Sequence, residues 1–460
     1  METMAASNLE MLETRSSASA YAEHVNPQWT RLLNLLEMNV RYIRCSGAEL
    51  FTENGTRILD FLSGYCVHNL GHNHPDVIAA LHQELEKHGP AMLQSHVPEV
   101  AGELAGELCR LAGGRIGKVF FCSSGSEGVE AAIKFARVRT KRSGLLCCHG
   151  AFHGLTCGAL SLMPGSTWAE GFAPLLPDVE SVPFGNLTEV EKKLATPKFA
   201  AFIVEPVQSE AGVRIPLPAY LPGVQSLCKK YGTLLIADEV QTGLYRTGKF
   251  LAAQHYGVEP DMVVLAKALS GGLVPSGAVL MTDEIYDAVY GSLSRSIIHT
   301  STYSENSLAM RAGLATLKVL EKENLGLRAA EMGARLRQRL KESLSAYEMV
   351  AEVRGLGMLS GIDFRAPQKL QLRLPFEAFR KIHAGMFGQI VVMKLFREQR
   401  ILTQMCGNNF MVLKAAPPLI VTENQIDEFV ASVKAVVEVV HSSGAFWLDA
   451  LYMAQRALNV

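Results

Sequence analysis

Four short apolar runs of this chain each end in residues that could carry chemistry. The runs and the residues after them are Phe120-Phe121 before Ser123-Ser124-Gly125-Ser126, Ile203-Val204 before Glu205, Ile236-Ala237 before Asp238-Glu239, and Val264-Leu265 before Ala266-Lys267. A hydroxyl-rich glycine turn can bind an anion, a carboxylate can hold a cation or a proton, and a lysine can form a Schiff base. Ligands of open α/β sheets bind beyond the carboxyl ends of the strands, so we expect these groups at one sheet edge.

The serine–glycine turn at 123–126 offers an anion site. Apolar residues follow it at helical spacing from Val129 to Ala136, so a helix begins at about Ser126 or Glu127. The free amides and the dipole of a helix N-terminus favour a phosphate, and serine hydroxyls add donors. A serine-rich turn can equally be a simple helix cap. Its spacing matches neither a Walker A loop nor a G-x-G-x-x-G dinucleotide motif.

Asp238 and Lys267 both stand at the end of apolar runs, where burial changes what a charged group can do. A buried carboxylate needs a cationic partner or several donors, which a helix cap or a structural ion pair would also supply. A lysine in such a place is either a surface residue with a buried stem or a desolvated amine with a lowered pKa. The second kind forms Schiff bases with carbonyl compounds.

An anion site, a buried carboxylate and a desolvated lysine together match the three requirements of pyridoxal 5'-phosphate. The phosphate would lie at the helix N-terminus, and Asp238 would pair with the ring nitrogen so that the ring can accept electrons. Lys267 would hold the aldehyde and later move a proton. The sequence therefore predicts a cofactor site that is assembled from segments far apart in the chain.

The elements that must position these residues follow from the hydrophobic pattern. The apolar runs are short and do not alternate, and helical patterns lie between them, which is typical of parallel strands buried on both faces. We therefore expect an α/β fold in which residues 76–330 form a large cofactor-binding domain. Its mainly parallel sheet would carry helices on both faces. A chain of 460 residues, 48% of them hydrophobic, can bury a core of this size.

The flanking segments predict a smaller α+β domain. Residues 1–75 would contribute an N-terminal segment with an amphipathic helix around Trp29. A hairpin would follow over 48–63, with its turn at Asn54-Gly55. Residues 331–460 would form the C-terminal part of the same small domain.

A long helical stretch at about 305–346 links the large domain to this C-terminal part, where strands are expected at 350–364 and 400–414 and a helix over 423–440. The tail after it is expected to form an amphipathic helix. Its shared apolar face comprises Leu448, Leu451, Tyr452 and Leu458. This face could pack on the protein, or it could cover a hydrophobic substrate or a membrane surface.

Composition excludes several classes of protein. The formal net charge is −1, so no strong field of one sign is available to attract nucleic acid or an anionic membrane. Nine cysteines at irregular spacing indicate reduced thiols, and the adjacent Cys147-Cys148-His149 lacks the spacing of a metal site. We see neither a signal peptide nor an apolar stretch long enough to span a bilayer. A cytoplasmic protein is therefore expected, without metal, nucleic-acid partner or membrane contact.

Six motifs resemble those of the class-III aminotransferases of fold type I, with the ornithine aminotransferases as the most similar branch. In order they are Ser124-Gly-Ser-Glu127, Phe152-His-Gly154, Glu205-Pro-Val-Gln-Ser-Glu210, Asp238-Glu-Val-Gln-Thr-Gly243, Lys267-Ala-Leu-Ser-Gly-Gly272 and Ser301-Thr-Tyr303. The resemblance runs from about Gly47 to Leu419. It implies a pyridoxal-phosphate-dependent aminotransferase that works by a ping-pong Schiff-base mechanism.

The resemblance also implies a role for individual residues. Lys267 and Asp238 would be catalytic, the first through the Schiff base and proton transfer, the second through the pyridine nitrogen. Val240 and Phe152 would enclose the ring, and Gln241 would approach its hydroxyl oxygen. The other implied cofactor contacts are Ser124, Gly125, Ser126, His153, Glu205 and, from the neighbouring subunit, Thr302. A homodimer with shared active sites follows from that last contact.

On the substrate side, Tyr65 and Glu210 would line the pocket, and two positions depart from the ornithine branch. Leu155 stands where that branch has an arginine for the substrate carboxylate, and Lys414 replaces an arginine that binds the keto acid. Leucine offers no charge, and lysine lacks the bidentate fork of arginine. A third departure, Ser304-Glu-Asn-Ser307 in place of Gly-Gly-Asn-Pro, lies near the phosphate.

We therefore expect a substrate other than ornithine, with a terminal primary amine or an aldehyde on a larger molecule. Glutamate could still serve as the common amino donor through Lys414 and Glu210, and Arg214 could instead replace the missing arginine. The first rival interpretation keeps the cofactor but makes the protein a decarboxylase, aminomutase or racemase. The second is a non-catalytic binding protein, against which the presence of both Lys267 and Asp238 argues.

Overall fold

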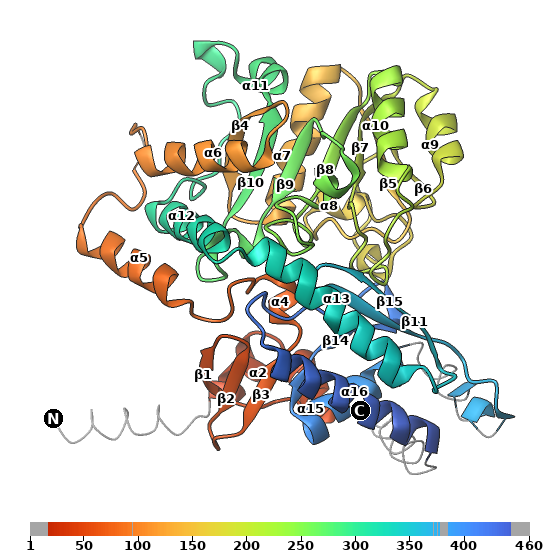
Figure 1. Cartoon of the computed structure of the whole chain (residues 1–460). Helices are drawn as coiled ribbons and strands as arrows, with labels where there is room; N and C mark the ends of the chain where they lie inside the picture. Colours follow the sequence, from red (N-terminus) through yellow and green to blue (C-terminus); the bar gives the residue numbers. More distant parts are fainter. Residues whose placement is uncertain (1–16, 94, 371, 375, 378–384, 443–460) are drawn as a thin grey trace.

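The structure, a computed structural model, describes residues 17–93, 95–370, 372–374, 376–377 and 385–442. A central sheet of seven strands has the order β4-β10-β9-β8-β7-β5-β6 (Figure 1). Its strands are β4 (Ile116–Cys122), β5 (Gly144–Cys148), β6 (Val179–Val182), β7 (Phe199–Val204), β8 (Leu234–Asp238), β9 (Met262–Leu265) and β10 (Gly277–Thr282). The four apolar runs of the sequence are β4, β7, β8 and β9, so the predicted mainly parallel sheet is confirmed.

Strand direction brings the polar residues together. The pairs from β6 through β9 are parallel, whereas β10 runs antiparallel to both β9 and β4. The carboxyl ends of β4, β5, β7, β8 and β9 therefore lie at one edge, and β10 begins there, with Gly277 opposite Cys122. Strand β10 was not predicted from the sequence, and it brings the residue before it, Ser276, to the same edge.

Helices cover both faces of this sheet, which explains why its strands are apolar without alternation. In β5, for example, Leu145 and Cys147 belong to the core cluster of α7, whereas Leu146 and Cys148 belong to that of α9 and α10. The helices of the two faces and of the adjoining segments are α5 (Pro75–Glu86), α6 (Glu99–Ala112), α7 (Gly125–Thr140), α8 (Cys157–Ser161), α9 (Leu187–Leu194), α10 (Tyr220–Tyr231) and α11 (Asp283–Tyr290). Short 3-10 turns are η1 (Thr167–Ala169), η2 (Ala252–Tyr256), η3 (Lys267–Ser270) and η4 (Leu293–Arg295).

Two four-stranded sheets lie below the central sheet in Figure 1. One has the order β1-β2-β3-β13, with β1 (Tyr42–Ser46), β2 (Glu49–Thr52), β3 (Arg57–Asp60) and β13 (Ile401–Leu402). The other has the order β11-β12-β15-β14, with β11 (Val350–Leu356), β12 (Leu359–Phe364), β15 (Asn409–Ala415) and β14 (Gln404–Cys406). The predicted hairpin at Asn54-Gly55 is confirmed as β2 and β3. Because β13 pairs with β3, the N-terminal segment and the C-terminal part share one sheet.

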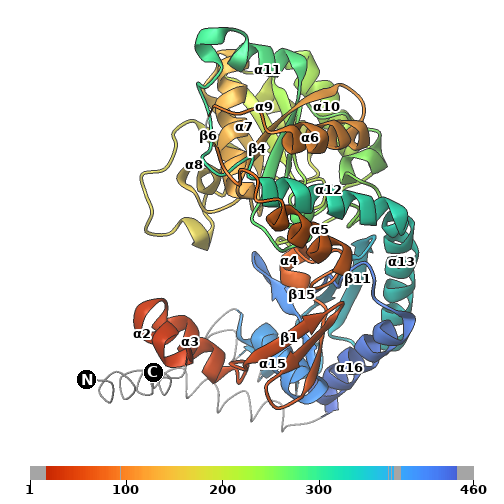
Figure 2. The ribbon, with the colours of Figure 1, turned by 90° about the vertical axis from the view of Figure 1, so that its left-hand side faces the viewer.

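The predicted helical stretch at 305–346 consists of two helices. They are α12 (Ser307–Lys322) and α13 (Leu325–Leu344), and Asn324 between them has a left-handed backbone with φ 51°. Figure 2 shows α13 running from the central sheet toward the smaller sheets. The predicted helix at 423–440 is α16 (Glu423–Ser442), and α15 (Met386–Gln399) packs beside it. The predicted tail helix, with Leu448 to Leu458, lies outside the described residues, and the domain bounds stay a prediction.

The N-terminal helices stand apart from the body of the molecule (Figure 2). They are α2 (Ser17–His24) and α3 (Pro27–Leu35), with Pro27 at the first turn as the sequence predicted. The amide of Trp29 is capped by the Asn26 side chain, but no residue of α3 is buried, so Trp29 and Leu32 are exposed. Along the described part of the chain, no helix combines the length and apolar character needed to cross a membrane.

Candidate active site

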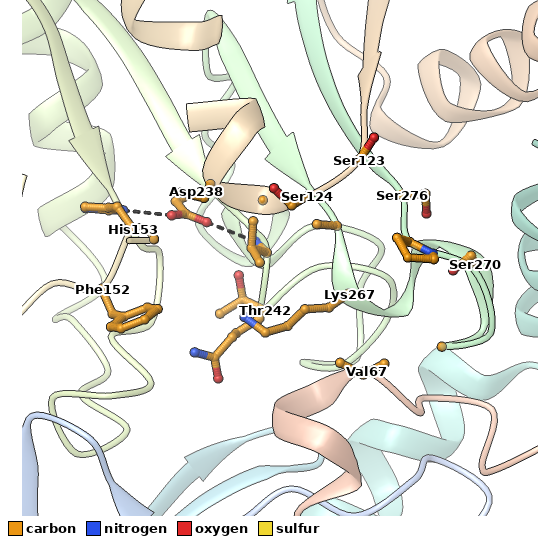
Figure 3. A pocket seen from close by; sticks show the side chains of 18 of the residues that line it. Val67, Ser123, Ser124, Phe152, His153, Asp238, Thr242, Lys267, Ser270 and Ser276 are labelled. Carbon is orange, nitrogen blue, oxygen red and sulfur yellow. Dashed lines mark hydrogen bonds and ion pairs between the residues drawn. The ribbon is translucent and has the colours of Figure 1, made fainter. Parts of the chain in front are cut away.

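A cavity of about 540 Å³ lies at the carboxyl edge of the central sheet. Figure 3 shows Phe152 and His153 on one side of it and Ser270 and Ser276 on the other. Every residue that the sequence analysis assigned to the cofactor, except Thr302, lines this cavity. These residues are Ser124, Gly125, Ser126, Phe152, His153, Glu205, Asp238, Val240, Gln241 and Lys267. The structure thus brings together groups from four strand ends and from the loop after β5.

The turn after β4 begins α7 and leaves amides free for an anion. The Ser124 hydroxyl accepts a hydrogen bond from the backbone amide of Glu127 at 3.2 Å. The backbone carbonyl of Ser124 accepts one from the amide of Gly128. The amides of Gly125 and Ser126, in the first turn of the helix, have no acceptor within the described residues. Like the first amides of any α-helix, they are available as donors to an anion. Ser124 is therefore a helix cap, and the free amides that follow it could hold an anion.

Two details of this turn were not predicted. A Cβ built on Gly125 would lie 2.9 and 3.0 Å from the two methyl carbons of Val240, so only glycine lets the helix start so close to that side chain. The Ser126 hydroxyl lies 2.7 Å from Oγ1 of Thr156 and accepts the amide of Thr156 at 3.1 Å. Ser126 therefore ties the helix start to the segment after Phe152, which leaves its backbone amide as the donor for an anion.

Asp238, the last residue of β8, is buried and held by two donors. His153 Nδ1 lies 2.7 Å from Oδ2 of Asp238, and the amide of Val240 donates to Oδ1 at 3.1 Å (Figure 3). Burial by itself lowers the pKa of a histidine, but the bond to Asp238 outweighs this and raises the pKa of His153. His153 therefore orients the Asp238 side chain through its Nδ1.

Glu205, the residue after β7, completes a buried acidic group. Its Oε1 accepts the amide of Phe152 at 3.0 Å, which fixes the backbone of the aromatic residue that lines the cavity. Burial, with the nearby Asp238 acting in the same direction, raises the pKa of Glu205 to about 7. The next acidic residue along the edge, Glu239, accepts the amide of Ala253 and the hydroxyl of Thr242, a cavity residue.

Lys267 enters the cavity from the first residue of η3. Its backbone is left-handed, with φ 48°, which is uncommon for a residue with a side chain. Desolvation lowers the pKa of its amine, although Asp238 acts in the opposite direction. In the described part of the chain the amine has neither an ion pair nor a hydrogen bond, so it is free to react.

Glu210 and Lys414 form a buried ion pair beside the cavity. Oε1 of Glu210 accepts hydrogen bonds from the Lys414 ammonium and, at 2.9 Å, from the side-chain amide of Gln241. Its Oε2 accepts a hydrogen bond from the backbone amide of Gly407 at 2.8 Å. The Lys414 ammonium also lies 5.3 Å from the ring centroid of Tyr65. The pair does not line the cavity itself and reaches it through Gln241. Its two charges neutralise each other.

Trp168 and Asn408 form a contact behind Phe152 that was not predicted from the sequence. The Trp168 indole donates to Oδ1 of Asn408 at 2.8 Å and meets the Phe152 ring edge-on, with centroids 5.6 Å apart. The Asn408 amide donates in turn to the carbonyls of Gly150 and Ala151, just before Phe152. Nothing in the sequence marks this contact, because neither residue follows an apolar run.

Four other predicted positions lie outside the cavity lining. Leu155 is 53% exposed, Thr302 is exposed, and neither lines the cavity of its own chain. Arg214 is exposed, and its backbone pairs with Gln208. Tyr65 is 40% exposed on a turn between β3 and the cavity.

Asp60 is a second buried aspartate whose place at a strand end the sequence could have indicated. It ends the apolar strand β3, as Asp238 ends β8, and it is 1% exposed.

Cys147 and Cys148 are buried strand residues, and burial raises the pKa of the Cys148 thiol to about 12. Among the described residues, no three histidine, cysteine or acidic side chains are gathered as for a metal ion.

The cavity fits a phosphorylated aromatic aldehyde such as pyridoxal phosphate. Gly125 supplies a start of α7 that no side chain blocks, and Val240 and Phe152 offer apolar surface for a ring. Asp238, fixed by two donors, can accept a ring N–H, and the unpaired Lys267 amine can meet an aldehyde. These are the residues that could hold such a cofactor.

The chain is similar over most of its length to proteins of known class. The family profile described as aminotransferase class-III matches residues 34–437. A putrescine aminotransferase of Pectobacterium atrosepticum is 35% identical over 451 residues, which cover 95% of this chain and 90% of that protein. The aminotransferase PigE of a Serratia species is 34% identical over 449 residues, which cover 91% of this chain and 53% of PigE. This chain thus spans about half the length of PigE.

Solved structures are similar as well. An ornithine aminotransferase from Toxoplasma gondii superposes with a TM-score of 0.78 at 28% identity, over 93% of this chain and 98% of that chain. Its crystals show partial occupancy of pyridoxal phosphate at the active site. The similarity extends over both the central sheet and the smaller sheets.

Proposed function

Since this chain belongs to the class-III aminotransferases, which use pyridoxal phosphate, we propose that it transfers an amino group from a terminal primary amine to an aldehyde or 2-oxo acid. One observation carries the choice of substrate. Lys267 and His153 are the only basic side chains among the described residues that line the cavity, and Asp238 holds His153. A donor without a carboxylate therefore suits this cavity better than ornithine.

The neutralised Glu210–Lys414 pair supports this proposal. A substrate carboxylate could reach Lys414 only by displacing Glu210, whose buried charge would then lose its cationic partner. Leaving a buried charge unpaired is costly, so such a substrate is disfavoured unless Glu210 turns to another donor. Glutamate would be admitted in that way, as the second amino donor of a ping-pong cycle. The putrescine aminotransferase relative, whose named substrate lacks a carboxylate, is in keeping with the proposal.

The proposed roles of individual residues follow from the site. When bound, the cofactor supplies an aldehyde carbon that condenses with an amine and a ring that accepts an electron pair. The amides of Gly125 and Ser126 would hold its phosphate, and Val240 and Phe152 would enclose its ring. Asp238 would keep the ring nitrogen protonated, and His153 would keep Asp238 oriented. Lys267, whose lowered pKa favours a neutral amine, would take the proton from the donor carbon.

We further propose a cytoplasmic homodimer with shared active sites, in which Thr302 contacts the phosphate of the other subunit. The segment that carries Thr302 exposes large apolar side chains, among them Leu293, Ile297 and Tyr303. The amide of Ser307 donates to the carbonyl of Ala91, so the exposed Leu93 lies on a neighbouring segment. Apolar exposure of this kind is typical of a subunit interface. All nine cysteines are free thiols, as expected in a reducing compartment.

A panel of amine donors tests the proposal through the absorbance of the bound cofactor. The panel contains putrescine, a hydrophobic monoamine, ornithine and glutamate, each with pyruvate or 2-oxoglutarate as acceptor in the second half-reaction. We expect the carboxylate-free donors to convert the cofactor to its amino form faster than ornithine does. A clear preference for ornithine would contradict the substrate proposal. Release of carbon dioxide from ornithine or glutamate, without conversion of the cofactor to its amino form, would favour a decarboxylase.

A further inference from the structure

The turn α4 (Ser63–Cys66), which joins β3 to the cavity wall, has an unusual backbone. Its four residues have φ values of 45°, 61°, 60° and 68°, and only Gly64 among them lacks a side chain. Left-handed backbone is unfavourable for residues with a Cβ, and three such residues in one turn persist only when surrounding groups hold them. The structure should therefore contain groups dedicated to holding this turn.

Asp60 is the first of these groups. Its Oδ1 accepts the amides of Leu62 and Ser63, both at 2.8 Å, and its Oδ2 lies 2.7 Å from Nε2 of His72. The carboxylate thus fixes the start of the turn by satisfying two amides that lie side by side. His72 keeps the carboxylate from rotating, because it occupies the second oxygen.

Arg246 fixes the same turn from another direction. It is fully buried, and its guanidinium donates to Ser63 Oγ at 3.3 Å, to Asn69 Oδ1 at 2.6 Å and to the carbonyls of Met358 and Pro417. The Ser63 hydroxyl donates to the carbonyl of Ala416 at 2.6 Å. The turn is therefore held between the loop after β8 and the segment that follows β15.

The residues that this turn presents face the site. Tyr65 lies over the Lys414 ammonium, with 5.3 Å from nitrogen to ring centroid, and keeps 40% of its surface exposed. Val67, just after the turn, lines the cavity, and a Cβ on Gly272 would lie 2.9 Å from its Cγ1. A change in the backbone at 63–66 would move both side chains.

We propose that Asp60 is a positioning residue: it holds the left-handed turn at 63–66 and thereby sets Val67 in the cavity lining and Tyr65 beside it, against Lys414. The proposal rests on the proposed function for its kinetic consequence, but not for its structural one. Asp60 touches neither substrate nor cofactor and acts through the turn. The donors affected are those large enough to reach Tyr65.

The test compares wild type with Asp60→Ala, Asp60→Asn and the control Asp261→Ala. Asp261 also accepts a backbone amide, that of Leu235 at 2.8 Å, and pairs with Arg115, but it lies at the opposite edge of the sheet. Two quantities are measured on the holoenzyme. The first is amide hydrogen exchange of the peptide that covers 61–68, and the second is kcat and KM for ethylamine and for 2-phenylethylamine.

In Asp60→Ala we expect faster exchange in this peptide and an increase in KM for 2-phenylethylamine on the order of tenfold, with kcat and the ethylamine constants nearly unchanged. Asp60→Asn should behave like wild type, because an amide oxygen can still accept both N–H groups. Asp261→Ala should leave this peptide and the ratio of the two donors unchanged. If Asp60→Ala does not fold, His72→Ala carries the test, with the same direction of change.

Unchanged exchange in the 61–68 peptide would overturn the proposal, whatever the kinetics. Faster exchange with an unchanged donor ratio would show that Asp60 serves the fold alone and would also overturn it. A wild type that transfers no amino group, while Asp60→Ala exchanges faster, would count against the proposed function and still support the hold of Asp60 on the turn. Proportional loss for both donors in all three variants would indicate a general loss of stability and contradict positioning.

Discussion

Nδ1 of His153 lies 2.7 Å from Oδ2 of Asp238, and both side chains are buried at the carboxyl edge of the central sheet. The amide of Val240 occupies the other oxygen of Asp238 at 3.1 Å. With both oxygens fixed, Asp238 offers only its remaining lone pairs to the cavity. His153 and Val240 therefore fix the direction in which the charge of the Asp238 carboxylate would face a bound ring.

The first prediction concerns that charge. Asp238→Asn removes it with little change in volume, and we expect turnover to fall by about 100-fold or more, as for other lost electrostatic partners. Steady-state kinetics with the best amine donor measure the effect, and the cofactor spectrum verifies that cofactor is bound. A turnover close to that of wild type would rule out the proposed role of Asp238.

The second prediction concerns Lys267, whose amine is unpaired in the cavity. Lys267→Ala should bind the cofactor but not turn over, because no other amine of the cavity lining can take the proton. Borohydride reduction of wild type should fix the cofactor covalently to the peptide that contains Lys267, as mass spectrometry can show. Label on a different lysine would refute the assignment.

The third prediction concerns Glu205 and pH. The pKa of Glu205 is raised from 4.5 to about 7, so the folded state keeps its proton up to about pH 7, whereas the unfolded chain loses it above about pH 4.5. The stability contributed by the protonated carboxyl is complete below pH 4.5 and is lost as pH rises through about 7. The loss is about 3 kcal/mol at most, since one pKa unit corresponds to roughly 1.4 kcal/mol.

Glu205→Gln has no such proton to lose. The Tm of this variant minus that of wild type should therefore grow from pH 5 to pH 8, as measured by thermal unfolding of the holoenzymes. The comparison isolates Glu205, because Glu239, whose pKa is also raised to about 7, is present in both proteins. A difference that stays constant over this range would contradict the prediction.

The fourth prediction concerns the proposed dimer. Lys267→Ala and Thr302→Ala subunits should each be impaired alone, but mixed dimers should regain activity. If Thr302 serves the other subunit, one site of each mixed dimer carries both lesions and the other carries neither. Purified hybrids with two different affinity tags provide the measurement. Verified hybrids that stay inactive would argue against shared sites.

The fifth prediction concerns Leu155, which is exposed beside the segment that Ser126 holds. Leu155→Arg adds a cation at the position of the arginine in the ornithine branch. Specificity constants for ornithine and putrescine should then shift toward ornithine, whereas wild type should prefer putrescine. A wild type that prefers ornithine would contradict the prediction regardless of the variant.

The sequence was sufficient to locate the reacting groups because of the geometry of parallel strands. Residues that follow buried parallel strands meet at one edge, so Glu205, Asp238 and Lys267 could be grouped from their positions in the chain alone. The rule does not extend to Asp60, because β3 pairs antiparallel with β2 in the predicted hairpin, whose strand ends need not reach a site.

Only the tertiary structure decided which of these groups are neutralised, held or free. Lys414 and Glu210 are separated by 204 residues and Trp168 and Asn408 by 240, and no local pattern specifies such pairs. The left-handed turn at 63–66 depends likewise on Arg246, from a loop far along the chain. Sequence order alone determined the chemistry that gathers at the sheet edge, since strand direction fixes it. The shape and charge of the substrate side depend on which distant segments pack there, because a charge is free or neutralised only by what lies within a few ångströms of it.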